Sequence, residues 1–191
     1  MLRNKKIGFV FTGSFYNYKL VIPKVKELIK MGANVLPIMS FNSYKIDTRF
    51  VRTKEIIMEI ENITSNKIIH TIKEAEPIGL KHLTDIMIIA PCSGNTLAKL
   101  ANGISDTPAT VAVKSHLRNE NNVVLAVSTN DALSTNAVNI GQLLNRKHFY
   151  FVPFRQENPI TKPYAMSFDV EYIIPCIEKA LFSEQIQPII L

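Results

Sequence analysis

The stretch Asp85–Gly103, DIMIIAPCSGNTLAKLANG, places an apolar run directly before a turn of small residues and a helix-like segment. The run up to Ala90 has no polar alternation, which is typical of a strand buried on both faces of a sheet. After Pro91, apolar residues recur at helical spacing until Gly103, a residue type that commonly ends helices. The stretch therefore predicts a strand, a turn and a helix, with the turn at the edge of a sheet.

The same order of strand and helix repeats along the chain. Apolar runs predict further strands at 6–13, 34–40, 122–129 and 148–152, and helical spacing predicts helices at 18–32, 53–62, 136–147 and 168–182. Residues 153–167 are expected to form a long loop. Because buried strands that alternate with amphipathic helices need cover on both sides, we expect an α/β fold: a three-layer, Rossmann-like parallel sheet with helices on both faces.

Composition favours one globular domain over residues 1–191, with 183–191 as a possible loose tail. A chain of this length buries roughly 70% of its unfolded-state surface. The formal net charge is +6, but Lys and Arg are spread along the chain without interleaved aromatic residues, so we do not expect a nucleic-acid partner. The chain opens without a leader pattern and has no apolar run of roughly 20 residues, which predicts a cytoplasmic protein with no membrane partner.

The residues that bear metal or redox chemistry show no recognisable spacing. Cys92 and Cys176 are far apart and match no zinc or disulfide pattern, and the four histidines make no metal set. We therefore predict no metal and no disulfide.

Ligands of such sheets bind beyond the carboxyl ends of the strands. The turn after the first strand lacks the G-x-G-x-x-G fingerprint, which disfavours the usual mode of dinucleotide binding. The N–H of Gly13 and the hydroxyl of Ser14 in that turn are nevertheless suited to contact a phosphate, and Ser40 stands at the end of the second predicted strand. An equally simple interpretation is that they only cap helices.

Two motifs resemble a known family. The segment 13–19, GSFYNYK, looks like the G-S-x-x-x-Y-K opening of the homo-oligomeric FMN-containing cysteine decarboxylases, and PCSGNT at 91–96 resembles their PASANT motif. The following LAKLANGISD matches the family continuation A-K-x-A-x-G-x-x-D. The resemblance implies a flavin mononucleotide (FMN) site. Its expected residues are Gly13, Ser14, Ser40, Cys92, Ser93, Gly94, Asn95 and Thr96.

One departure from the family bears on its chemistry. The essential histidine of the decarboxylases stands fourteen residues before the motif proline, and that position is Pro77 in this sequence. Proline cannot transfer a proton. His82 lies nearby but is displaced by five positions, so we do not assign the role to it. Cysteine decarboxylation is therefore not expected.

Carboxylate recognition is expected to remain. The family segment P-x-M-N, whose asparagine holds a substrate carboxylate, resembles VSTN with Asn130 retained. Asn130 is equally well explained as a turn residue or helix cap. Arg155 and Lys162 are candidate partners of a dicarboxylate, although as loop cations they need no specific role.

The longer stretches VSTNDALS, PFRQENP and KP extend the resemblance over the whole chain. They imply one chain of a two-subunit oxidoreductase from a spore-forming bacterium, acting on a small dicarboxylate, with a nicotinamide dinucleotide on the partner subunit. Family relatives also imply a homo-oligomer, either a trimer or a dodecamer. Two alternatives remain open, an independent FMN-dependent decarboxylase and a non-catalytic scaffold subunit with the flavin fold.

Overall fold

Seven strands form one mixed sheet in residues 1–50 and 52–191, the part of the chain that the computed structural model describes. Their order is β2–β1–β3–β4–β7–β6, and β5 pairs with β4 outside this path. The strands are β1 (Lys6–Phe11), β2 (Asn34–Met39), β3 (Ile86–Cys92), β4 (Val123–Thr129), β5 (Phe149–Phe151), β6 (Phe154–Asn158) and β7 (Lys162–Phe168).

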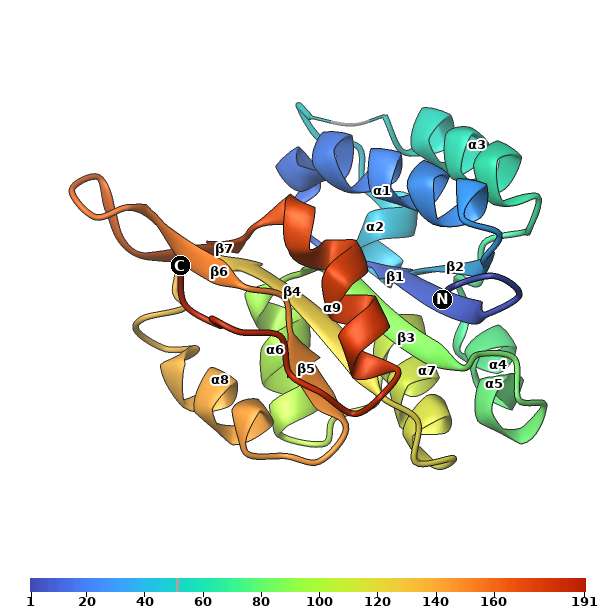
Figure 1. Ribbon diagram of the computed structural model, residues 1–191. Coiled ribbons are helices and arrows are strands. Elements are labelled where there is room, and N and C mark those ends of the chain that lie inside the picture. The colour runs from blue at the N-terminus through green and yellow to red at the C-terminus, as the bar shows by residue number, and fades with distance from the viewer. Residues whose placement is uncertain (51) are drawn as a thin grey trace.

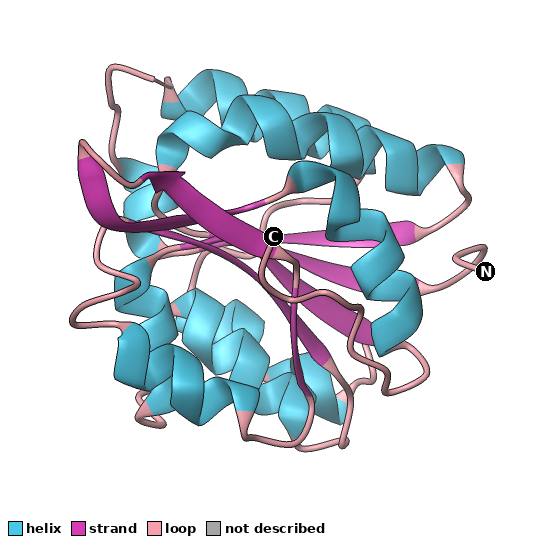
Figure 2. Cartoon of the chain, turned by 60° about the vertical axis from the view of Figure 1, so that its left-hand side comes forward, coloured by secondary structure: helices cyan, strands magenta, loops and turns pink. Residues whose placement is uncertain are grey.

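Helices cover both faces of the sheet, which confirms the expected three layers (Figures 1 and 2). The longer helices are α1 (Tyr18–Lys30), α3 (Thr53–Thr64) and α9 (Ile173–Ala180) on one face, and α6 (Gly94–Ala101), α7 (Pro108–Leu117) and α8 (Ala137–Leu144) on the other. The short ones are α2 (Phe41–Lys45), α4 (Ile72–Ala75), α5 (Pro77–Leu80), η1 (Phe15–Asn17) and η2 (Val170–Tyr172). None of the described helices has both the length and the apolar character needed to cross a membrane.

The central strands lie in the core because their side chains are apolar on both faces. All seven residues of β3 are buried, as are the first six of β4. Each fully buried aliphatic side chain contributes about 1.5–3 kcal/mol relative to exposure. β1 pairs in parallel with β2 and β3, and β3 pairs in parallel with β4. The carboxyl ends of these four strands therefore lie along one edge of the sheet.

The prediction of a loop at 153–167 is wrong, because this segment forms most of an antiparallel hairpin of β6 and β7. The hairpin joins the sheet where Ser128 and Thr129 of β4 pair with Ser167 and Met166. Its turn is held by Asn158, whose side-chain oxygen accepts hydrogen bonds from two backbone N–H groups. The prolines and polar residues of this segment interrupt the apolar pattern by which strands are recognised in a sequence. Because β6 and β7 pair in antiparallel fashion, the sheet is mixed and not wholly parallel as expected.

Helix α7 is also missing from the elements that the sequence predicts. Pro108 occupies its first position, and Thr107 and Thr110 cap it reciprocally. Its residues are buried on most sides, so it shows little of the amphipathic contrast by which helices are recognised. A search for helical periodicity therefore does not detect this buried helix. A proline at the first helical position is nevertheless a signal for the start of a helix.

The C-terminal residues run back along β6. The N–H of Phe154 donates to the carbonyl of Ile189 at 2.9 Å, and the N–H of Leu191 donates to the carbonyl of Phe154 at 3.1 Å. The Gln185 side chain also bonds the N–H and carbonyl of Phe151. These contacts tie the tail to the edge of the sheet near the hairpin.

Candidate functional site

Four chain segments meet at the carboxyl edge of the sheet and enclose a cavity of about 570 Å³. We call it the carboxyl-edge cavity. It is lined by residues 14–16 after β1, 48–50 after α2, 93–95 at the start of α6, and 128–131 at the end of β4. Parallel sheets bind ligands at this edge, and the cavity is within the usual size range of small-molecule sites.

The turns after β1 and β3 are joined by direct hydrogen bonds. The Thr12 hydroxyl donates to the carbonyl of Pro91 at 2.7 Å and accepts from the N–H of Ser93 at 3.0 Å. Ser14 has a left-handed backbone (φ 66°), and its hydroxyl donates to the carbonyl of Ser128 at 2.8 Å. Gly13 lies beside Ser93, where a Cβ would approach the Ser93 Cβ to 3.3 Å. The polar turns are therefore fixed against one another by hydrogen bonds within the chain.

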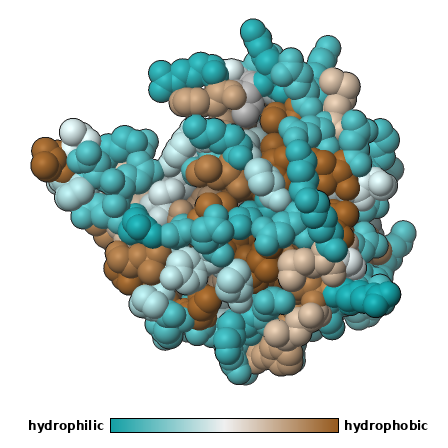
Figure 3. Space-filling view, turned by 45° about the horizontal axis from the view of Figure 1, so that its top comes forward, coloured by the Kyte–Doolittle hydropathy of each residue, from teal (hydrophilic) through white to brown (hydrophobic). Residues whose placement is uncertain are grey.

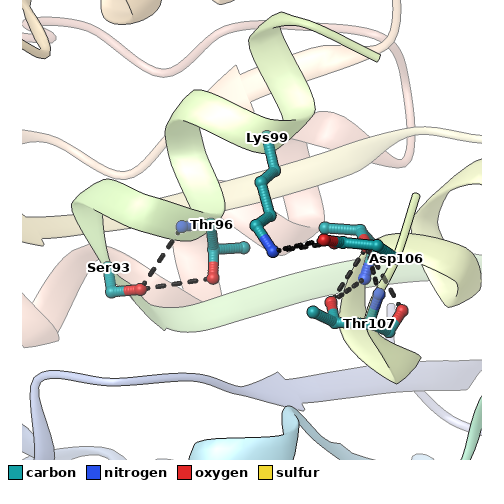
Figure 4. A network of polar contacts seen from close by, with 6 residues as sticks. Ser93, Thr96, Lys99, Asp106 and Thr107 are labelled. Atoms are coloured by element: carbon teal, nitrogen blue, oxygen red, sulfur yellow. Dashed lines mark hydrogen bonds and ion pairs between the residues drawn. The ribbon is translucent and has the colours of Figure 1, made fainter. Parts of the chain in front are cut away.

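The PCSGNT segment forms the end of β3 and the start of α6. Ser93 is the N-cap: its hydroxyl accepts from the N–H of Thr96 at 3.5 Å and donates to the Thr96 hydroxyl at 3.2 Å (Figure 4). Asn95 lines the cavity, is exposed, and makes no side-chain hydrogen bond to another described residue. The hydroxyls thus hold the helix start, while the Asn95 amide is left to face a ligand.

The Lys99 and Asp106 side chains have a structural role beside this segment. The Lys99 ammonium contacts both carboxylate oxygens of Asp106, at 2.7 and 2.8 Å, and Asp106 directly precedes the cap of α7 (Figure 4). This ion pair fastens the loop between α6 and α7. Neither side chain lines the carboxyl-edge cavity.

Gly94 is required by a polar cluster that the sequence does not reveal. The Asp131 carboxylate accepts from the Thr129 hydroxyl at 2.5 Å and from the Asn136 amide at 2.9 Å. A Cβ at Gly94 would lie 2.4 Å from Thr129 Oγ1, 2.7 Å from Asn136 Nδ2 and 3.0 Å from Asp131 Oδ1. The negative charge of Asp131 therefore lies against the positive end of α6, a stabilising arrangement.

Cys92 does not present a reactive thiol. Its side chain is fully buried at the end of β3 and does not line the carboxyl-edge cavity. Burial raises the pKa of the thiol far above its usual range, so the nucleophilic thiolate is disfavoured. The residue contributes a small buried side chain under the turn.

Ser40 lies at the end of β2, next to β1, since its N–H donates to the carbonyl of Phe11 at 3.0 Å. Its hydroxyl caps α2 through Ser43.

Asn130 is exposed and lies between two cavities, because it lines the carboxyl-edge cavity and a larger neighbouring one. The Ser40 hydroxyl is therefore occupied by the cap of α2, while the Asn130 amide faces open space.

The hairpin is connected to the site through Tyr16. The Tyr16 hydroxyl donates to the Glu157 carboxylate at 2.5 Å and lies 3.0 Å from the Ser128 hydroxyl. Lys162 pairs with the same carboxylate at 2.7 Å. Burial opposes ionisation of Glu157, but its hydrogen bonds to Lys162 and Tyr16 prevail and lower its pKa. Arg155 instead pairs with Asp169 and lines neither cavity.

The donor set fits a flavin mononucleotide. In the described part of the chain, the amides of Asn95 and Asn130 have no hydrogen-bond partner, and the rings of Phe15 and Phe50 lie on the same lining, while the Asp131 carboxylate is already bonded by Thr129 and Asn136. Amides suit the polar edge of a flavin ring, and aromatic rings suit its faces. Among the described residues, no group of three or more His, Cys, Asp or Glu side chains is arranged to hold a metal ion.

Sequence reasoning misses the residues that surround this cavity outside the two motifs. Arg49 and Phe50 belong to a segment between helices for which no element is predicted, and Tyr16 occupies a variable position of the first motif. Asp131 directly follows Asn130 and is the one detectable signal, because a carboxylate beside a proposed ligand residue invites attention.

Comparison with known proteins identifies full-length relatives. The family model described as Flavoprotein matches residues 1–181. The B subunit of dipicolinate synthase from Bacillus subtilis is 42% identical over 190 residues, which span 100% of this chain and 95% of the relative. A crystal structure of the dipicolinate synthase B subunit from Bacillus halodurans matches with a TM-score of 0.92 and 39% identity, covering 100% of this chain and 97% of that one.

A more distant structure shares the fold alone. The FMN-dependent cysteine decarboxylase SpaF matches with a TM-score of 0.67 at 22% identity, covering 95% of this chain and 98% of that one. The resemblance inferred from the GSFYNYK and PCSGNT motifs is thereby confirmed. With a family match over nearly its whole length and a full-length relative of high identity, this chain belongs to the Flavoprotein family.

Proposed function

We propose that this chain is the B subunit of a dipicolinate synthase and binds FMN in the carboxyl-edge cavity. With the A subunit of that enzyme, it would oxidise dihydrodipicolinate to dipicolinate (pyridine-2,6-dicarboxylate) in the mother-cell cytoplasm during spore formation. The observation that carries the proposal is the 42% identity to a relative of this name over the whole chain. The position of the cavity at the carboxyl edge of the sheet supports the flavin part.

The flavin site is proposed on residues of the two motifs and on Ser40, which follows β2. Asn95 and Gly94 line the cavity together with Ser93 and Ser14, and the buried Cys92 supports the turn from below. Gly13, Ser40 and Thr96 complete the proposed set by holding the surrounding turns through backbone and hydroxyl contacts. Bound FMN would supply a two-electron redox centre.

The substrate would be held through its carboxylates. Asn130 is proposed as one ligand because its amide faces both cavities, and Lys162 as another because it lines the larger one. Arg155 is held by Asp169 and Lys162 by Glu157, so the proposal rests chiefly on Asn130. The reaction removes a hydride and a proton from the dihydropyridine ring. An oxidised nicotinamide on the partner is proposed to accept the hydride, and the proton is released to solvent.

An independent cysteine decarboxylase is the second candidate within enzymes, and the lack of a histidine among the described residues that line the two cavities opposes it. Pro77 begins α5, which lies with α4 at the amino edge of the sheet, opposite the cavity (Figure 1). It has neither a proton to transfer nor a position on the lining of either cavity. A scaffold subunit is the third candidate, and assembly as a homotrimer or dodecamer is compatible with every candidate.

Mixing the two proteins tests the proposal. This chain, its partner, dihydrodipicolinate and an oxidised nicotinamide dinucleotide are combined at varied protein ratios, and dipicolinate is followed by its ultraviolet absorbance. We expect activity only with both proteins, and loss of at least about tenfold in kcat/KM for Asn130→Ala. Asn145→Ala at the end of α8 is the matched control and should retain full activity. Full activity of the partner without this chain would contradict a catalytic role for this chain.

A further inference from the structure

A second cavity, of about 770 Å³, adjoins the carboxyl-edge cavity and runs between α1 and α3. We call it the α1–α3 cavity. The two share five lining residues, which form a common wall: Phe15, Tyr16, Arg49, Phe50 and Asn130. Figure 3 shows this side of the molecule, where brown apolar surface is framed by teal polar side chains. A ligand in one cavity would therefore lie next to a ligand in the other.

The α1–α3 cavity is lined by apolar and aromatic side chains as well as by charged ones. Phe15 and Phe50 line it at the common wall, and Ile22 and Ile56 line it from the two helices. Phe50 is 54% exposed; its ring meets the Tyr16 ring at a centroid distance of 6.2 Å and the Arg49 guanidinium, and the rest of its surface is open to a ligand. A planar aromatic ligand would cover this surface and stack on the rings.

Four cations line the same cavity, and they fall into two classes. Lys26 is paired with Glu59 at 2.8 Å, and Lys162 is paired with Glu157 at 2.7 Å. By contrast, no carboxylate among the described residues lies within ion-pair distance of Lys19 or Arg49. Two positive charges beside the apolar walls are thus left without a counter-charge from the described part of the chain.

The setting of these two charges favours an anion. Arg49 stacks on the Phe50 ring, 4.7 Å from its centroid, which orients the guanidinium along the wall. Lys19 lies in the first turn of α1, where no acidic residue is present and where the helix dipole adds to its positive charge. An anion placed between them would relieve the repulsion between like charges.

We propose that the α1–α3 cavity is the site of the planar aromatic dicarboxylate, with Arg49 and Lys19 each receiving one carboxylate group. This assignment rests on the proposed function for its ligand, but it gives a role to Arg49, which lies outside both motifs, and to Lys19, the last residue of the first motif. It also places the ring beside the shared wall, within reach of Asn130 and adjacent to the proposed flavin.

Calorimetric titration of pyridine-2,6-dicarboxylate into the full chain tests the assignment. We expect saturable one-to-one binding that weakens about fivefold or more in Arg49→Ala and in Lys19→Ala, since each removes one partly screened charge-assisted contact. Pyridine-2-carboxylate, with one charge fewer, should bind more weakly than the dicarboxylate to wild type. It should also lose less of its affinity than the dicarboxylate when one of the two cations is removed.

Two controls match the charge changes. Lys30→Ala removes an exposed lysine from the same helix, and Arg118→Ala removes an arginine at the end of α7; neither residue lines the cavity. If a control variant lost as much affinity for pyridine-2,6-dicarboxylate as its matched variant, the binding would be nonspecific attraction between the anion and a basic protein, and the assignment would be overturned. Absence of saturable binding, while the two proteins mixed together still make dipicolinate, would overturn it and leave the proposed function standing. Specific binding without activity in the mixture would support the assignment and count against the proposed function.

Discussion

Replacing Gly94 with alanine should damage both the stability of the chain and its flavin site. The new Cβ would lie 2.4 Å from Thr129 Oγ1 and 2.7 Å from Asn136 Nδ2, distances that real Cβ atoms do not show. Both atoms belong to the cluster that holds the Asp131 carboxylate, so the cluster has to move. The perturbation is one methyl group at the start of α6.

The magnitude follows from the contacts that the methyl group displaces. Overpacking a filled site costs about 1–3 kcal/mol, and losing one hydrogen bond to a charged group costs about 1.5–3 kcal/mol. The better helix propensity of alanine offsets this by at most about 1 kcal/mol. We expect a net loss of about 2–4 kcal/mol in the free energy of unfolding, which lowers Tm by about 5–15 °C for a chain of this size.

Thermal and urea unfolding measure this loss, and flavin fluorescence measures the accompanying loss of FMN affinity. Gly141→Ala in α8 is the matched control, because a Cβ there meets no atom within 4 Å. It should stabilise the chain by about 0.5–1 kcal/mol and leave FMN binding unchanged. If Gly94→Ala were as stable as wild type, the packing of the cluster against α6 would be refuted.

Three further predictions concern the hairpin and the buried thiol. Tyr16→Phe removes the hydroxyl that bonds Glu157 and should increase backbone hydrogen exchange in β6 and β7, whereas the control Tyr164→Phe should not. Unchanged exchange in Tyr16→Phe would exclude a role of the Tyr16–Glu157 hydrogen bond in holding the hairpin. Because the pKa of Glu157 is lowered from 4.5, its contribution to stability is present above that pH and is lost as the pH falls through the folded-state pKa. The difference in unfolding free energy between wild type and Glu157→Gln should therefore shrink below about pH 4, and a constant difference would count against the ionised contact. Cys92 should resist thiol reagents until the chain unfolds, and fast labelling of the native chain would contradict its burial.

The layers and most of the elements are predictable from the sequence because their signals are local. The run before Pro91 is apolar throughout, and β3 is indeed buried along its whole length. Prediction fails where the signal is tertiary. The hairpin strands depend on pairing between β4 and β7, and α7 is buried on most sides, so neither displays a periodic pattern.

The candidate site also contains residues that local sequence patterns locate and residues that only tertiary contacts bring to it. The motifs locate Ser93, Gly94 and Asn95 at the cavity, because turns after parallel strands meet at one edge regardless of sequence distance. They give no indication that Asp131 lies against Gly94 or that Arg49 faces the same space. Those contacts arise from loops whose conformations depend on packing across the sheet edge, which a single sequence does not display.

Titration of FMN into the isolated chain tests the central claim most directly, since the proposed function places a flavin in the carboxyl-edge cavity. Flavin fluorescence should change saturably at one FMN per chain. Asn95→Ala, which removes a free amide from the lining, should weaken binding, while Asn145→Ala at the far end of α8 should bind like wild type. A fluorescence signal that never saturates, or equal affinities for wild type and Asn95→Ala, would contradict a flavin site at this edge of the sheet.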